Sequence, residues 1–144
     1  MKRTILSLML AWLLTACVSF LPGYDEAVHR QLEAALADIN KVGAAVALEP
    51  QPPFERIEPF YISALGNLRG AEASASGAVR NYQGSPAAGS AKLVAGAIGE
   101  CRAAVERMMT QHRDHGLTRR LFERSNLAGG TCSIAVAMSA RLRR

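Results

Sequence analysis

Apolar residues recur at alternating steps of three and four along much of this 144-residue chain. This spacing places them on one face of an α-helix, so it predicts amphipathic helices that pack against one another. The first predicted helix runs from Asp25, its N-cap, to about Leu48, and Pro50, Pro52 and Pro53 end it. Its apolar face consists of Val28, Leu32, Ala35, Ile39, Val42 and Val46.

The same spacing predicts a second and a third helix. The second runs from about Phe54 to Tyr82, with an apolar face of Ile57, Tyr61, Ala64, Leu68, Ala71, Ala75, Ala78 and Tyr82. A connector rich in glycine, serine and proline, residues 83–90, separates it from the third. The third runs from about Ala91 to His112, and Gly116 shortly after it suits a left-handed helix stop. Its apolar face consists of Val94, Ile98, Cys101, Val105, Met108 and His112.

A fourth helix is predicted from the cap residue Thr118 to about Leu142. Its face is Leu121, Ser125, Ala128, Cys132, Ala135, Ser139 and Leu142. Gly129 and Gly130 interrupt it, and either the helix breaks there or it continues with a closely packed neighbour. We favour continuity, because the turn at Gly116 places the two glycines opposite Ala104 and Ala103.

These elements predict an all-α fold, an antiparallel up-down-up-down four-helix bundle that buries all four apolar faces. Alanine is abundant and β-branched residues are sparse, which favours helix over sheet. The domain is expected to occupy residues 24–144, a length that suits a single core.

The start of the chain is typical of a signal peptide. Lys2 and Arg3 precede an uncharged run, residues 4–16, which is too short to span a bilayer comfortably. The run ends in Leu14-Thr15-Ala16-Cys17, which resembles the lipobox of bacterial lipoproteins. This resemblance implies that residues 1–16 are removed, that Cys17 is lipidated, and that residues 17–23 form a short tether.

The same resemblance suggests a location. In lipoproteins of double-membrane bacteria, aspartate after the cysteine favours the inner membrane, whereas this chain has Val18. The pattern therefore implies the periplasmic face of the outer membrane. An ordinary secretory signal that happens to end near a cysteine is the alternative.

Cys101 and Cys132 lie at facing positions of the third and fourth helices if Gly116 and Leu117 centre the turn between them. The periplasm is oxidising, so we expect a disulfide between them. Two buried thiols that act as small apolar side chains are the alternative.

Charge is unevenly distributed along the chain. Residues 17–100 carry six basic and nine acidic side chains, whereas residues 101–144 carry nine basic and three acidic ones. The terminal arginines Arg141, Arg143 and Arg144 are candidates for contact with an anionic surface. A solvated tail is the alternative.

No Gly-x-Ser-x-Gly, His-Glu-x-x-His or phosphate-binding glycine loop is present in the sequence. We therefore expect a protein that is not an enzyme and holds no cofactor. The cluster from His112 to His115 is the one metal-like grouping, and Arg113 within it opposes a cation. Haem ligands would have to come from Met108, Met109, Met138 and His112, which are more typical of core residues.

The lipobox resemblance implies an outer-membrane lipoprotein, and elimination leaves a structural or protein-interaction role, for example as an accessory subunit of an envelope assembly. A bundle that binds haem, a metal or a lipid is one alternative, and an adaptor for an anionic surface is another. The expected partners are the membrane, through Cys17, and an envelope protein, but not nucleic acid.

Overall fold

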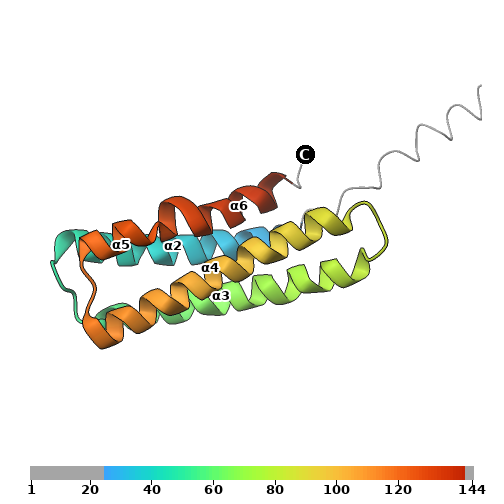
Figure 1. Cartoon of the computed structure of the whole chain (residues 1–144). Coiled ribbons are helices and arrows are strands. Elements are labelled where there is room, and N and C mark those ends of the chain that lie inside the picture. Colours follow the sequence, from blue (N-terminus) through green and yellow to red (C-terminus); the bar gives the residue numbers. More distant parts are fainter. Residues whose placement is uncertain (1–24, 142–144) are drawn as a thin grey trace, which may run out of the picture.

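The computed structural model describes residues 25–141, which form an all-α bundle, as predicted (Figure 1). Three long helices are followed by a fourth column made of three shorter pieces. The elements are α2 (Glu26–Leu48), α3 (Phe54–Asn81), α4 (Ala88–His115), α5 (Arg119–Ser125), the π-helical turn η2 (Leu127–Thr131) and α6 (Cys132–Arg141). The predicted signal peptide, Cys17, the tether, the predicted core residue Leu142, and Arg143 and Arg144 lie outside the described residues.

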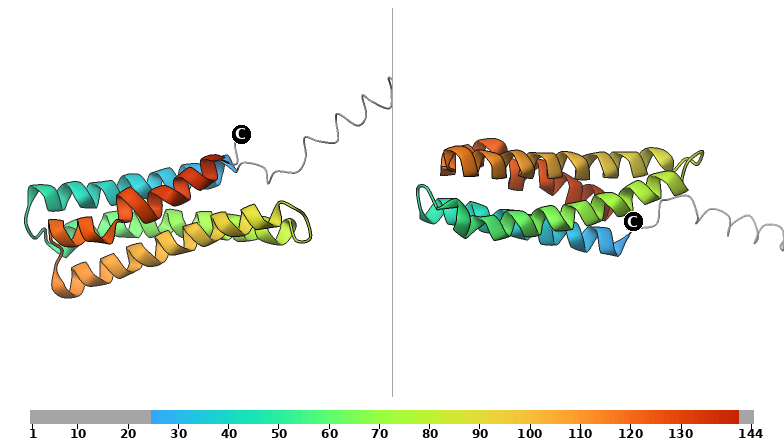
Figure 2. Two further views of the ribbon diagram at one scale, coloured as in Figure 1. Left: turned by 45° about the horizontal axis from the view of Figure 1, so that its top comes forward. Right: turned by 90° about the horizontal axis from the view of Figure 1, so that it is seen from below.

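The four columns form a ring in which each contacts two neighbours. Helix α3 packs between α2 and α4, and α6 closes the ring by contacting both α4 and α2. Successive columns run in alternating directions in Figures 1 and 2, which is compatible with the predicted up-down-up-down order. The start of α2 and the end of α6 lie at one end, here called the proximal end. Residues 49–53 and 116–118 form the loops at the opposite, distal end.

The predicted faces of the first three helices form most of the core. Every residue predicted for the faces of α2 and α4 is buried. On α3 the face is buried through Ala75, while Ala78 and Tyr82 are only half-buried. Leu65 was not predicted in the core but is buried beside Ala64 and Leu68, so the buried face of α3 is wider than the predicted stripe.

Side-chain caps fix two of the helix starts as the sequence predicted. The Asp25 Oδ1 atom accepts hydrogen bonds from the backbone N–H groups of Ala27 at 2.9 Å and Val28 at 3.2 Å. Thr118 Oγ1 accepts from Leu121 N–H at 3.3 Å and begins α5. These bonds satisfy N–H groups that have no partner within the helix.

The expected continuous fourth helix is wrong. Asn126 adopts φ 50° and ψ 30°, the left-handed conformation, and ends α5. The backbone then follows a wider π-helical turn, in which Thr131 N–H donates to the Asn126 carbonyl oxygen five residues earlier, at 3.0 Å. Asparagine adopts left-handed geometry more readily than most residues, so the column breaks here rather than at the glycines themselves.

The break shifts which residues of the fourth column face the core. Leu121 was predicted in the core but is 39% exposed, and Ser125 and Ala128 are only half-buried. Leu127 is buried in their place, with 2% exposure. The extra residue in the wide turn rotates the residues before it relative to those after it. Cys132, Ala135 and Ser139, which follow the turn, are buried as predicted.

The glycine pair also has a different neighbour from the one predicted. A Cβ atom on Gly130 would collide with the side-chain amide of Asn126, and one on Gly129 would meet Asn126 Oδ1 at 3.4 Å and no atom of a neighbouring helix within 4 Å. The expected close approach to Ala103 and Ala104 is therefore not what requires glycine here. Gly130 leaves room for the side chain of the residue that breaks the helix.

Candidate functional site

Cys101 on α4 and Cys132 on α6 face each other in the core, as the register around Gly116 predicted. Their sulfur atoms lie within disulfide distance of each other, and their Cα atoms are 4.8 Å apart. Both residues are buried. Cys132 directly follows η2, so this pair fixes the fourth column to α4 just after the helix break.

His112 lies in the core near the distal end and both of its ring nitrogens have partners. Its Nε2 atom is 2.9 Å from the Pro52 carbonyl oxygen, which can only accept, so Nε2 carries the hydrogen. The Nδ1 atom then accepts from the Tyr61 hydroxyl at 3.3 Å. Burial raises the pKa of Tyr61, which keeps this hydroxyl protonated. His112 therefore joins the loop after α2 to α3 and α4.

This placement separates the residues of the metal-like cluster. His112 faces the core, whereas Asp114 and His115 are exposed. Arg113 Nε donates to Asp114 Oδ1 at 2.9 Å, and this bond lowers the pKa of the Asp114 carboxyl. Over residues 25–141 there is no group of three or more histidine, cysteine, aspartate or glutamate side chains arranged to hold a metal.

The methionines considered as haem ligands belong to the hydrophobic packing. Met108 is buried, and Met109 and Met138 are half-buried against the core. His112, the histidine proposed with them, already uses both nitrogens. The side chains present fill the core in the way that flexible methionines commonly do.

A serine, a histidine and a glutamate form a chain of contacts between α6 and α2 that sequence analysis did not predict. Ser139 Oγ lies 2.8 Å from His29 Nδ1, and His29 Nε2 lies 3.4 Å from Glu33 Oε1. The Ser139 hydroxyl also donates to the Val136 carbonyl oxygen at 2.8 Å. A hydroxyl has one hydrogen, so His29 must donate to Ser139 when both bonds are made.

The contact from His29 to Ser139 is therefore a polar link between two helices rather than an activated nucleophile. Ser139 is buried and the Glu33 side chain is largely exposed. One signal in the sequence pointed to it. Ser139 is a polar residue on a predicted core face, and buried hydroxyls require a partner.

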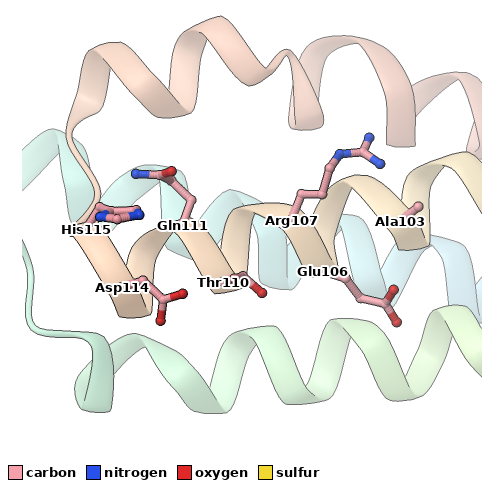
Figure 3. A pocket seen from close by; sticks show the side chains of 7 residues that line it. All are labelled: Ala103, Glu106, Arg107, Thr110, Gln111, Asp114 and His115. Atoms are coloured by element: carbon pink, nitrogen blue, oxygen red, sulfur yellow. The ribbon is translucent and has the colours of Figure 1, made fainter.

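A shallow depression of about 430 Å³ lies on the outer side of α4, and Figure 3 shows its lining side chains. Glu106 and Asp114 point toward α3, whereas Arg107 and Gln111 point toward the fourth column. Arg102 donates to Glu106 at 2.9 Å and to Glu72 on α3 at 2.6 Å. Glu106 therefore takes part in an ion-pair network between α3 and α4.

A second depression, here called the distal groove, lies between the end of α2, the loop that follows it and the start of α5. Its volume is about 460 Å³. Leu48, at the last residue of α2, is 89% exposed. The groove is lined by Val46, Ala47, Leu48, Pro50, Gln51, Thr118, Arg119 and Arg120. Its lining thus combines apolar residues with two arginines.

Of the three arginines predicted to contact an anionic surface, the structure describes one. Arg141 is exposed at the proximal end of α6, while the other two terminal arginines lie beyond the described residues. None of the helices within residues 25–141 is long and apolar enough to cross a membrane.

Comparison with known protein families found no match, and comparisons with curated proteins and with solved structures found none either.

Proposed function

We propose that this chain is a lipid-anchored protein of the bacterial cell envelope whose helical bundle acts as a protein-interaction module. Two sequence features support the anchor, namely the basic and apolar start of the chain and the lipobox-like Leu14-Thr15-Ala16-Cys17. Val18 after the cysteine supports the periplasmic face of the outer membrane.

The distal groove is the observation that carries the interaction role. Leu48 exposes nearly its whole side chain beside an apolar depression, and a large apolar side chain in that setting gains by being covered. The interior of the described bundle is occupied by packed side chains from all four columns. The features open to a partner therefore lie on the surface.

Crosslinking in intact cells tests this proposal. We expect the full-length protein to sediment with the outer membrane and to form adducts with at least one other envelope protein. A protein found only in the soluble periplasmic fraction, without adducts, contradicts both parts of the proposal. A visible absorbance band in the purified protein would instead favour the alternative of a haem-binding or metal-binding bundle.

A further inference from the structure

We propose that the distal groove binds an acidic amphipathic segment of a partner protein. An apolar side chain of that segment packs beside Leu48, and its carboxylates meet Arg119 and Arg120. This inference rests on the proposed interaction role, and it adds the surface that is used and the chemistry of the partner.

The apolar part of the argument comes from the end of α2. Leu48 stands almost entirely in solvent, and Val46, Ala47 and Pro50 line the groove beside it. A leucine packed against this surface would remove apolar area of both chains from water. One apolar anchor entering a small groove is a common way in which proteins recognise short segments.

The positive charge of the groove favours a partner segment with negative charge. Arg119 donates to Glu123 at 2.7 Å, but both side chains are largely exposed, and such pairs contribute little to stability. Within the described residues, Arg120 and Arg124 make no ion pair. Guanidinium groups bind carboxylates with two parallel hydrogen bonds, so acidic side chains suit this rim.

Helix α5 supplies an independent observation. None of its residues is fully buried, and Leu121 is exposed because the break at Asn126 changes the orientation of this segment. Phe122 packs close to Gly43 of α2, where an added Cβ would lie 2.6 Å from the ring. Helix α5 therefore packs on the bundle through Phe122, and it leaves the side chains of Leu121, Arg119, Arg120 and Arg124 exposed.

The position of the groove favours a protein over a lipid surface. It lies at the distal end, whereas both ends of the described chain lie at the proximal end (Figure 2). A membrane anchor at Cys17 would therefore leave the groove facing away from the bilayer. An acidic protein segment is the occupant that fits this position and this charge.

Site-specific photo-crosslinking in intact cells tests the proposal with the full-length protein. The probe p-benzoylphenylalanine replaces Leu48 or Leu121, one at a time, and matched probes replace Ile62 and Leu93, which are 60% and 64% exposed. We expect adducts from Leu48 and Leu121 to join one partner segment, read by mass spectrometry, that contains both acidic and apolar residues.

Charge reversal provides the second arm. The double variant Arg119→Glu and Arg120→Glu should lower the adduct yield at Leu48 by about tenfold, because like charges would then face each other. The matched variant Arg30→Glu and Arg80→Glu changes two exposed arginines on α2 and α3 and should leave the yield unchanged. Circular dichroism of both purified variants checks that the bundle is folded.

Several results would overturn the groove as the site. One is that adducts from Leu48 join a basic segment, a lipid or a second copy of this chain. Another is that charge reversal leaves the adduct yield at Leu48 unchanged. Adducts found only from Ile62 or Leu93 would reject the groove but retain the interaction role. Adducts from none of the four positions would reject both proposals.

Discussion

At the scale of single residues, His112 shows how a polar side chain can hold a small core together. It is 2% exposed and it satisfies the Pro52 carbonyl while accepting from Tyr61. Phe54 lies edge-on to its ring, with 5.5 Å between the centroids. Removing the imidazole would create a cavity and leave two buried polar groups without a partner.

We therefore expect His112→Ala to lower the free energy of unfolding by about 3 kcal/mol. Denaturant titration followed by circular dichroism measures this change. His115→Ala, at an exposed position on the same helix, is the control and should change stability by less than about 0.5 kcal/mol. Equal effects of the two variants would contradict the structural role of His112.

Gly130 provides a second test at this scale. In Gly130→Ala the new Cβ would collide with the Asn126 amide, so we expect a loss of about 1 kcal/mol. Adding Asn126→Gly should recover most of it, because glycine tolerates φ 50° and removes the amide. Both values come from thermal or denaturant unfolding.

Gly66→Ala is the matched control for Gly130. Its added Cβ would meet nothing within 4 Å, and alanine favours a helix interior, so stability should stay the same or rise by up to about 1 kcal/mol. If Gly130→Ala were as benign as Gly66→Ala, the packing of Asn126 against Gly130 would be wrong.

At the scale of elements, the cysteine pair controls how α6 is held. We expect Cys101 and Cys132 to be oxidised in native protein, and non-reducing peptide mapping by mass spectrometry should find them joined. Removing the bond by Cys101→Ala and Cys132→Ala should cost about 3–4 kcal/mol, because the bond closes a loop between residues 31 apart. Two freely alkylated thiols in unreduced material would contradict this prediction.

The helices that could be predicted are those where local pattern and tertiary packing agree. On α2 and α4, every residue that steps of three and four from Val28 and Val94 place on the apolar face is buried in the structure. Periodicity failed in the fourth column, since it assumes a constant number of residues per turn. The left-handed residue Asn126 and the wide turn after it rotate the helix face, so that Leu121 is exposed although Cys132 is buried as predicted.

The candidate site was less predictable than the fold. The facing cysteines followed from register alone, but the pairing of His29 with Ser139 joins residues 110 positions apart and depends on how α6 returns to α2. The distal groove depends on the placement of α5, and the prediction of one continuous fourth helix placed this segment incorrectly. Polar partners and surface shape arise from tertiary contacts that no local pattern contains.

At the scale of the whole molecule, the first prediction concerns the anchor. Cys17→Ala should abolish lipidation and normal cleavage after Ala16, because the thiol is the acceptor for the lipid in the family that the lipobox resembles. Membrane fractionation and mass measurement of the protein read both effects. A Cys17→Ala protein that is still acylated and processed at Ala16 would refute the anchor.

The second prediction concerns the basic end of the chain. Arg141 lies at the proximal end, and the sequence places Arg143 and Arg144 directly after it. Each arginine near an anionic surface contributes about 1 kcal/mol, so replacing all three by glutamine should weaken binding of the unlipidated domain to anionic vesicles at low salt. Vesicle co-sedimentation measures this.

The matched control replaces three arginines of the distal end, Arg113, Arg119 and Arg120, by glutamine. If the terminal arginines carry the binding, these changes should leave it nearly intact, because a domain bound through its proximal end keeps its distal end away from the vesicle. Equal binding with and without the three terminal arginines would remove a membrane role for them.

The alternating columns also set a fixed reach. Helix α3 has 28 residues, and a rise of 1.5 Å per residue gives the bundle a length of about 42 Å. A tether over residues 17–23 adds at most about 25 Å when fully extended. With lipid on Cys17 as proposed, the bundle would be a rigid spacer. It would present the distal groove roughly 40–65 Å from the bilayer, so that only partners reaching this height could be engaged.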